Sequence, residues 1–229
     1  WDAVIASGVD SLSFSLDGLG PTHDRLRGQR GAWKLTMAAL KRASAHPGLA
    51  TSVYFTVTRD NVRELVAVFE QVRRLGAGFD FWPVNDAPDL YVVDPADQAV
   101  FREAVDHIGA ALPEVAARRS YYEAGLAYHA GEGGPVRCLG MVDQYGVKYT
   151  GELMPCCVWD GSGLVQGNVL ETPLRELWTS PEVQRFRESL FHEGCAVGCF
   201  NHSLYEFEVS TGLPTGVAPP AGVGGAPLR

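Results

Sequence analysis

Hydrophobic and polar residues follow two different periods in the first half of the chain. Short β-prone runs predict strands over residues 11–16, 51–58 and 79–84. Helical spacing predicts helices over residues 32–45, 62–75 and 95–112, and the end of a further helix over residues 1–7. Strands that alternate with helices of this length favour parallel βαβ units. The pattern therefore predicts an α/β fold with a parallel sheet.

The predicted strands have two unlike faces. In the first strand Leu12, Phe14 and Leu16 alternate with serines, and the second strand alternates in the same way. A parallel strand covered on both sides is usually apolar throughout. We therefore expect one face to pack on helices and a hydroxyl-lined face to surround a polar ligand, as in part of a barrel. The alternative is an antiparallel sheet with one solvated face, which the helix-length connections disfavour.

The second half of the chain has a different pattern. Its glycine-rich stretch over residues 135–165 predicts hairpins. Short helices are predicted over residues 174–178 and 183–191, where Thr172-Pro173 and Ser180-Pro181 are typical helix starts. The nearly uncharged stretch from Pro214 to Arg229 is predicted to be disordered.

Composition narrows the class of protein. The chain has 229 residues, of which 46% are hydrophobic, so a packed core is feasible. Its net charge of −8 argues against a nucleic-acid binder with a broad basic face. No apolar run approaches the roughly 20 residues of a membrane span, so we expect no membrane association and a cytoplasmic location.

All five cysteines lie after residue 137, at Cys138, Cys156, Cys157, Cys195 and Cys199. Clustered thiolates in glycine-rich turns commonly hold zinc or an iron–sulfur cluster, and the spacing does not distinguish the two. Buried free thiols and disulfides are the alternatives. Neighbouring side chains rarely reach the same metal, so we predict that Cys157 is a spare.

Several motifs together resemble the radical S-adenosylmethionine (SAM) enzymes. Residues Ser13 to Gly18, followed by His23-Asp24 and Arg27-Gly28, resemble the fourth barrel strand and its loop. Residues Thr56 to Asn61 resemble the fifth strand. The second half resembles the SPASM/Twitch extension of these enzymes, and the motifs that carry this likeness are Cys138, Gly151 to Cys156, Gly167 to Val169, Leu174 to Trp178, Ser180, Arg187 and Cys195 to Cys199.

The resemblance implies a fold and a function. It implies the C-terminal half of a partial (β/α)6 barrel over residues 1–112, a small α+β SPASM/Twitch domain over 113–212 and a tail over 213–229. In such enzymes a [4Fe–4S] cluster cleaves SAM to a 5′-deoxyadenosyl radical, here expected to oxidise or cross-link a peptide or small-molecule substrate. The implied partners are that substrate and an electron donor such as ferredoxin or flavodoxin.

The resemblance also implies site residues. Ser15, Arg27 and Asn61 match positions that contact SAM; their alternatives are a barrel-filling serine, a surface arginine near Asp24 and a helix cap. One auxiliary [4Fe–4S] cluster is implied on four cysteines: Cys138, Cys156, Cys195 and Cys199. His192 occupies the first position of the late C-x2-C-x3-C motif and is expected to be a surface residue. No catalytic acid–base pair stands out.

The sequence departs from the family in one respect. It has no cysteine before Cys138, so the C-x3-C-x2-C loop that holds the SAM-cleaving cluster is absent, as are the first three barrel strands. We expect an incomplete fragment of a longer enzyme; the competing interpretation is a degenerate homologue. The alternative functions are a non-catalytic binding module with a structural four-cysteine site, zinc or iron–sulfur, and a zinc-stabilised interaction domain.

Overall fold

The computed structural model describes residues 1–85, 87–132, 140–142, 144–156 and 165–193. The chain divides into two compact units, Trp1–Tyr122 and Glu123–Arg229, which are described separately. The domain boundary predicted after residue 112 stays a prediction. The tail predicted over residues 213–229 lies outside the described residues.

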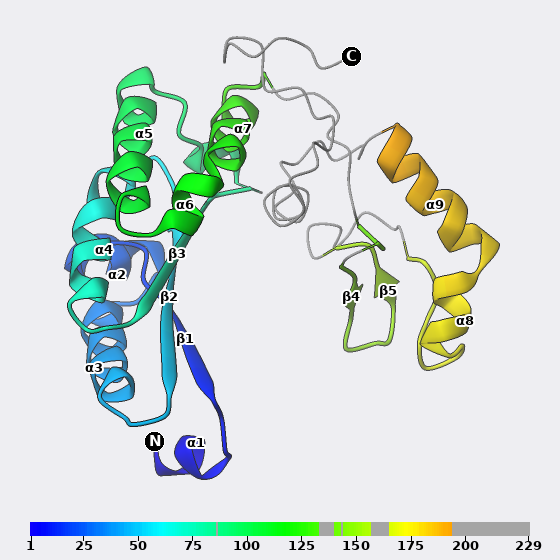
Figure 1. The fold of residues 1–229 in the computed structure, drawn as a ribbon, viewed down its shortest axis with the longest axis horizontal. Coiled ribbons are helices and arrows are strands. Elements are labelled where there is room, and N and C mark those ends of the chain that lie inside the picture. Colours follow the sequence, from blue (N-terminus) through cyan, green and yellow to red (C-terminus); the bar gives the residue numbers. More distant parts are fainter. Residues whose placement is uncertain (86, 133–139, 143, 157–164, 194–229) are drawn as a thin grey trace. The chain divides into compact units, whose positions relative to one another are not determined.

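A three-stranded parallel sheet forms the centre of the first unit (Figure 1). It consists of β1 (Ser11–Ser15), β2 (Ala50–Val57) and β3 (Gly78–Pro83), in that order. The register places Phe14 beside Val53, and Val53 beside Phe79. The parallel sheet predicted from the alternation of strands and helices is therefore confirmed.

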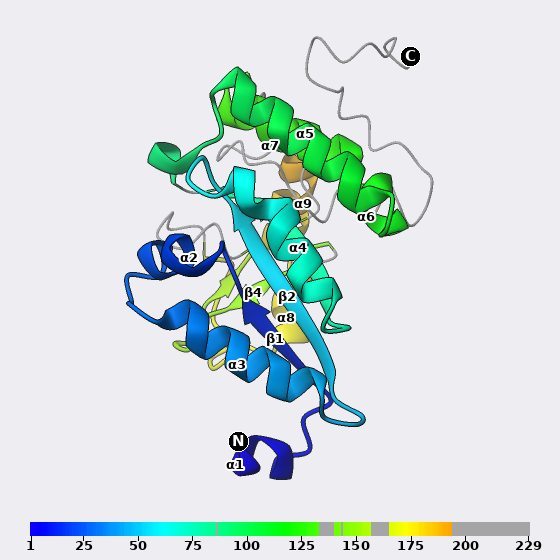
Figure 2. The same ribbon diagram turned by 90° about the vertical axis from the view of Figure 1, so that its left-hand side faces the viewer.

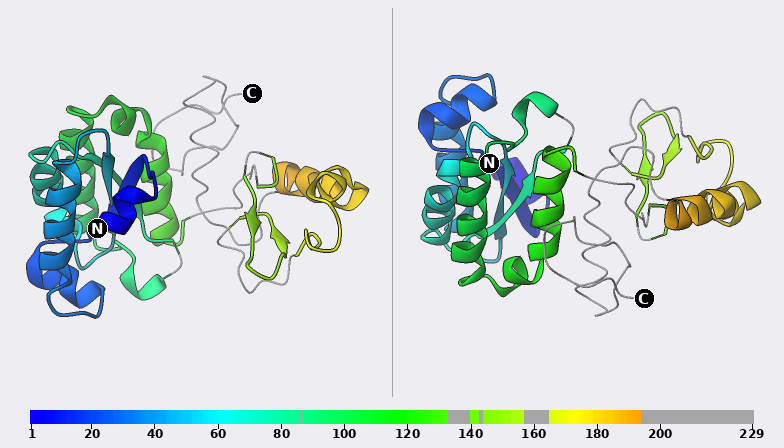
Figure 3. Two further views of the ribbon diagram at one scale, coloured as in Figure 1. Left: turned by 90° about the horizontal axis from the view of Figure 1, so that it is seen from below. Right: turned by 90° about the horizontal axis from the view of Figure 1, so that it is seen from above.

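Helices connect the strands and cover one face of the sheet. Figures 2 and 3 show α3 (Ala32–Ser44) and α4 (Leu65–Arg73) on that face. The other helical segments of the unit are α1 (Asp2–Ala6), α2 (Gly20–Leu26), η1 (Val62–Glu64), η2 (Pro88–Leu90), α5 (Pro95–Gly109), α6 (Pro113–Ala117) and α7 (Arg119–His129), within which the first unit ends.

The core of the first unit lies between the sheet and these helices. Val53, Phe55 and Val57 are fully buried on the helix-covered face of β2. Phe81 of β3 stacks on Tyr122 at the start of α7, with ring centroids 4.7 Å apart, and meets Phe101 of α5 edge-on at 6.0 Å. Burial of such aromatic side chains is worth about 1.5–3 kcal/mol each, so this cluster fixes α5 and α7 on β3.

The opposite face of the sheet is polar and largely exposed. Ser13, Ser15 and Thr56 are exposed there, and the hydroxyls of Ser13 and Ser52 lie 2.8 Å apart across the two strands. The predicted two-faced strands are thus confirmed, with the hydroxyls on the side away from α3 and α4. A face of this kind can meet a polar ligand without displacing core residues.

Three helices were not predicted from the sequence, namely α2, α6 and α7. The helix predicted over residues 62–75 also starts differently, because its first turn is the 3₁₀ segment η1. The suggested cap at Asn61 is wrong as a side-chain cap: its side chain makes no cap hydrogen bond and instead bonds the backbone of the strand ends.

The second unit contains a small hairpin and two helices. β4 (Gly146–Val147) and β5 (Leu153–Met154) are antiparallel, which confirms a hairpin in the glycine-rich stretch. Met141, Leu153 and Val183 form its core beneath α8 (Leu174–Thr179) and α9 (Pro181–His192). The hydroxyl of Ser180 accepts a hydrogen bond from the Val183 N–H at 3.2 Å, so the predicted start of the second helix is confirmed. Among the described residues no helix is long and apolar enough to cross a membrane.

Candidate functional site

A buried carboxylate links the loop after β1 to the neighbouring strand. The side chain of Asp17 is 8% exposed and forms an ion pair with Arg27. Its Oδ1 also accepts a hydrogen bond from the Thr56 N–H of β2 at 2.8 Å. Asp17 therefore holds Arg27 near the carboxyl ends of the strands, which is where α/β proteins commonly bind ligands.

Asn61 joins the ends of β1 and β2 through three backbone groups. Its Nδ2 donates to the carbonyl oxygens of Asp17 at 3.0 Å and Thr56 at 2.8 Å, and its Oδ1 accepts from the Thr58 N–H at 2.7 Å. Asn61 is 1% exposed. All three hydrogen bonds of its side-chain amide go to the backbone. Asn61 therefore positions the carboxyl ends of β1 and β2 relative to each other.

Glu64 fixes the start of the loop after β1. It accepts hydrogen bonds from the Leu19 N–H at 2.6 Å and from the Thr22 hydroxyl at 2.7 Å. A Cβ at Gly18, where φ is 149°, would lie 2.8 Å from both Glu64 Oε2 and Thr22 Cγ2. Glycine at position 18 therefore permits the close approach on which this contact depends.

His23 belongs to the same buried group of polar residues. Its Nδ1 accepts a hydrogen bond from the Asp17 N–H at 3.0 Å, and the residue is 1% exposed. Burial lowers the pKa of His23 below its ordinary value, outweighing the opposing effect of the Asp17 charge. The imidazole is therefore neutral at pH 7, as its acceptor role requires.

We expect stability to fall as the pH drops below about 6.5, the ordinary pKa of histidine. In that range the unfolded chain binds a proton at His23 that the folded chain does not bind, so protonation favours unfolding. His23→Gln should flatten the decline of the urea unfolding midpoint between pH 7 and pH 5. The control His192→Gln, at an exposed site on α9, should keep the wild-type slope; equal slopes in all three proteins would contradict this account.

The predicted SAM-contacting residues fall in two settings. Arg27 and Asn61 are linked through Asp17, whereas Ser15 lies on the exposed polar face two positions before Asp17. The side chain of Arg27 is 40% exposed, so part of its guanidinium faces solvent although it is paired. The ion pair with Asp17 restricts the direction of the Arg27 guanidinium.

An aromatic strip, formed by Tyr54, Trp82 and Tyr121, runs across the polar face. Tyr54 is 42% exposed and stacks on Trp82 at 6.4 Å, and Trp82 meets Tyr121 edge-on at 6.0 Å. Arg118 lies 5.6 Å above the Trp82 ring and forms two hydrogen bonds with Asp80, at 3.0 and 3.1 Å. Tyr54 and Trp82 thus offer an aromatic surface on an otherwise polar face, and the buried Tyr121, 3% exposed, supports Trp82.

Asn85 follows β3, and its side-chain oxygen is unusual in being buried without a hydrogen bond within the described part of the chain. Its Oδ1 is buried and has no hydrogen-bond partner among the described residues, while its backbone carbonyl accepts from the Tyr91 hydroxyl at 2.8 Å. Buried amide oxygens are normally satisfied, so an unsatisfied one at the carboxyl end of a strand fits a ligand donor.

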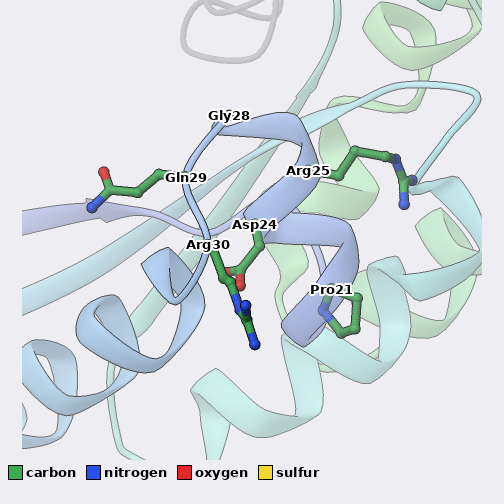
Figure 4. Close-up of a pocket in the computed structure, with 6 residues that line it drawn as sticks. All are labelled: Pro21, Asp24, Arg25, Gly28, Gln29 and Arg30. Carbon is green, nitrogen blue, oxygen red and sulfur yellow. The ribbon is translucent and has the colours of Figure 1, made fainter.

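A shallow hollow of about 470 Å³ lies beside α2 and its following loop (Figure 4). Asp24 lines it and accepts hydrogen bonds from the Trp33 and Gly31 N–H groups, at 2.8 and 2.6 Å, which lower the pKa of its carboxyl. Arg25 and Arg30 point in different directions in Figure 4. Their charges do not converge, so the hollow lacks the arrangement of an anion site.

In the second unit, Cys156 follows β5 and is half-buried. It packs with Leu190 and Phe186 of α9. Arg187 of the same helix donates from Nε to the carbonyl of Met141, three positions after Cys138 in the sequence. Cys138, Cys195 and Cys199 lie outside the described residues, as does Cys157.

Other candidate ligands and bases are few in the part of the chain that the structure describes. That part holds no group of three or more His, Cys, Asp or Glu side chains arranged for a metal. The carboxylate of Glu152 accepts from the Thr150 hydroxyl at 2.9 Å and lies 3.8 Å from Lys148. These contacts of the Glu152 carboxylate are therefore local ones within the turn between β4 and β5.

Residues 138–200 match the family of SPASM iron–sulfur cluster-binding domains. The match spans all four predicted cysteine ligands and the helices α8 and α9. The chain thus carries a SPASM iron–sulfur domain and is similar to AdoMet-dependent enzymes. The SPASM match and these relatives confirm the resemblance inferred from the sequence and favour iron–sulfur over zinc at the cysteines, while the choice of ligands stays a prediction.

Curated relatives of the chain include two enzymes named as heme or pre-heme d1 synthases and one maturation protein. It is 28% identical over 202 residues to the AdoMet-dependent heme synthase of Methanosarcina barkeri, an alignment covering 79% of the chain and 56% of the relative. It is 24% identical over 219 residues to the pre-heme d1 synthase of Dinoroseobacter shibae (79% and 51%). A shorter match, 36% over 67 residues, is to the sporulation killing factor maturation protein SkfB of Bacillus subtilis (29% and 16%). The chain thus spans little more than half of the heme synthase.

Several residues of the candidate site were not singled out from the sequence. Arg118, at the end of α6, and Tyr121 of α7 were missed because neither helix was predicted. Glu64 was missed because it lies within a predicted helix. The buried residues Tyr122, Leu126 and His129 follow the spacing of one helix face, and this signal could have located α7. No comparable sequence signal marks Glu64.

Proposed function

We propose that this chain supplies the SAM-facing half of a partial (β/α)6 barrel and the auxiliary-cluster domain of a radical SAM oxidoreductase. The observation that carries the proposal is the match of residues 138–200 to an iron–sulfur domain, directly after three parallel βα units. In this family a [4Fe–4S] cluster cleaves SAM to a 5′-deoxyadenosyl radical that abstracts a substrate hydrogen. The residues of this chain bind, orient and shield the reactants.

The SAM-facing edge is proposed to comprise Ser15, Arg27 and Asn85. Ser15 offers a hydroxyl on the exposed face, and the unsatisfied Oδ1 of Asn85 offers an acceptor for an amine or hydroxyl. The exposed part of the Arg27 guanidinium suits a carboxylate, since Arg has five donors and Asp17 does not use them all. Asn61 then acts through Asp17 and Thr56, as a positioning residue.

The substrate is proposed to lie against the aromatic strip. Tyr54 and Trp82 face the same side of the sheet as Ser15, and stacked aromatic rings are rigid contact surfaces. Relatives are named for heme synthesis and for maturation of a killing factor, so both small molecules and peptides remain within the proposed class. Hydrogen abstraction followed by loss of an electron would need an acceptor, a role suited to the auxiliary cluster, with ferredoxin or flavodoxin as proposed redox partners.

The auxiliary cluster is proposed to bind Cys138, Cys156, Cys195 and Cys199. The half-buried Cys156 lies against α9, and this helix ends at His192, three positions before Cys195. Arg187 of α9 also holds Met141, which follows Cys138 closely. One helix therefore anchors chain segments adjoining three of the four ligands, which supports a shared cluster.

SAM binding tests the proposal. Equilibrium dialysis of labelled SAM against the anaerobically reconstituted chain should show saturable binding. Arg27→Met should weaken it about 10- to 100-fold, because a hydrogen bond to a charged group contributes about 1.5–3 kcal/mol. Arg27→Lys should retain part of the affinity, and Arg25→Met, at an exposed site on the same helix, should match the wild type. No SAM binding by a chain with its full auxiliary cluster would contradict the proposed SAM contacts of the first unit.

A further inference from the structure

Two contacts hold the side chain of Arg187 near the centre of α9. Its Nε donates to the carbonyl of Met141, and its guanidinium lies 4.0 Å from the centroid of the Trp178 ring. Burial lowers the pKa of Arg187, although the group stays protonated at neutral pH. These contacts fix the position and the orientation of the positively charged guanidinium group within the second unit.

One nitrogen of this guanidinium lacks a partner. Nη2 is buried and makes no hydrogen bond to any residue that the structure describes. A charge taken from water costs several kcal/mol unless an opposite charge or hydrogen bonds compensate it. Arginine cannot escape this cost by losing its proton, so an anionic acceptor is expected beside Nη2.

The position of Arg187 along α9 relates it to the predicted cluster ligand Cys156. Its neighbour Phe186 and Leu190, three positions further on, pack together with Cys156. Phe186 also contacts the core of Met141, Leu153 and Val183. Arg187 therefore lies on the same helical segment as the contacts of the described cysteine, and a cluster on four thiolates carries net negative charge.

We propose that Arg187 is the counter-charge of the auxiliary cluster and raises its reduction potential. This rests on the proposed iron–sulfur site. Adding one electron makes the cluster more negative, so a fixed cation in a poorly solvated site stabilises the reduced form more than the oxidised form. The same cation offers N–H groups to cluster or cysteine sulfur. Arg187 thus acts as a positioning residue that changes the reduction potential of the cluster.

A redox titration of the reconstituted full chain with dithionite, followed by electron paramagnetic resonance, tests this role. Arg187→Gln keeps a donor for the Met141 carbonyl but removes the charge. It should lower the equilibrium constant for reduction about tenfold, which is about 59 mV for a one-electron couple. Arg187→Lys, which keeps the charge, should stay near the wild-type potential. Arg185→Gln is the matched control, because Arg185 is 68% exposed on the same helix and pairs with Glu182.

Iron and sulfide counts separate the possible outcomes. A Gln variant that holds its cluster at the wild-type potential would overturn the inference, as would equal falls in the Gln and Lys variants. If the Gln variant holds no cluster, the Lys variant decides the question. A full cluster near the wild-type potential in the Lys variant supports the role of Arg187 as counter-charge. A tenfold fall in its equilibrium constant for reduction overturns that role. A wild-type chain without iron and sulfide would contradict the cluster itself, and the inference with it.

Discussion

Replacing Cys156 with alanine is expected to abolish the intact cluster of the reconstituted chain. The thiol is half-buried in the hydrophobic cluster of Leu190 and Phe186, and removing it takes away one of the four predicted ligands. The brown absorption and the signal of a reduced [4Fe–4S] cluster should both be lost. Because metal binding contributes folding free energy, the second unit should also unfold at a lower temperature.

The adjacent cysteine supplies the control for this experiment. Cys157→Ala should retain the wild-type iron and sulfide content, since we predict that it is a spare thiol. The comparison is sensitive to a shift of one residue in the ligand assignment. A full cluster in the Cys156 variant together with its loss in the Cys157 variant would show that the ligand is Cys157.

Replacing Asn61 with alanine is expected to destabilise the first unit by about 2–4 kcal/mol. The substitution leaves two carbonyls, of Asp17 and Thr56, and the Thr58 N–H without their side-chain partner in a buried setting. Each unsatisfied buried group costs about 1–3 kcal/mol, less where a carbonyl has a second bond. Urea unfolding at pH 7 measures the change.

The neighbouring residue provides a matched surface variant. Asp60 is exposed, and Asp60→Ala should alter stability by no more than about 0.5 kcal/mol. The Asn61 variant should also bind SAM more weakly, because the Asp17 loop that carries Arg27 loses a tether. An Asn61 variant as stable as the Asp60 variant would contradict the role of Asn61 at the strand ends.

The sheet was predictable because its signals are local. Alternation of Leu12 and Phe14 with serines in β1 fixes which side chains face the helices, and the helix-length connections fix the parallel direction. Buried aromatic residues such as Phe81 then follow from the same alternation. The SPASM match likewise confirms a resemblance carried by short, ordered motifs.

The polar network at the strand ends was not predictable in the same way. Asn61 has the residue type and position of a helix cap, and only the tertiary contact with the Asp17 carbonyl shows why its amide is used elsewhere. Glu64 and Arg118 act on residues more than 35 positions away. No local pattern records such partners, because the pairing depends on the register of the strands.

The central claim is that the cysteines of the second unit bind one auxiliary [4Fe–4S] cluster. Mössbauer spectroscopy of the wild-type chain, reconstituted anaerobically with ⁵⁷Fe and sulfide, tests it most directly. The account predicts about four iron and four sulfide per chain, with the spectrum of a single [4Fe–4S] cluster bound by thiolates. A colourless protein that takes up one zinc ion and no sulfide would contradict it.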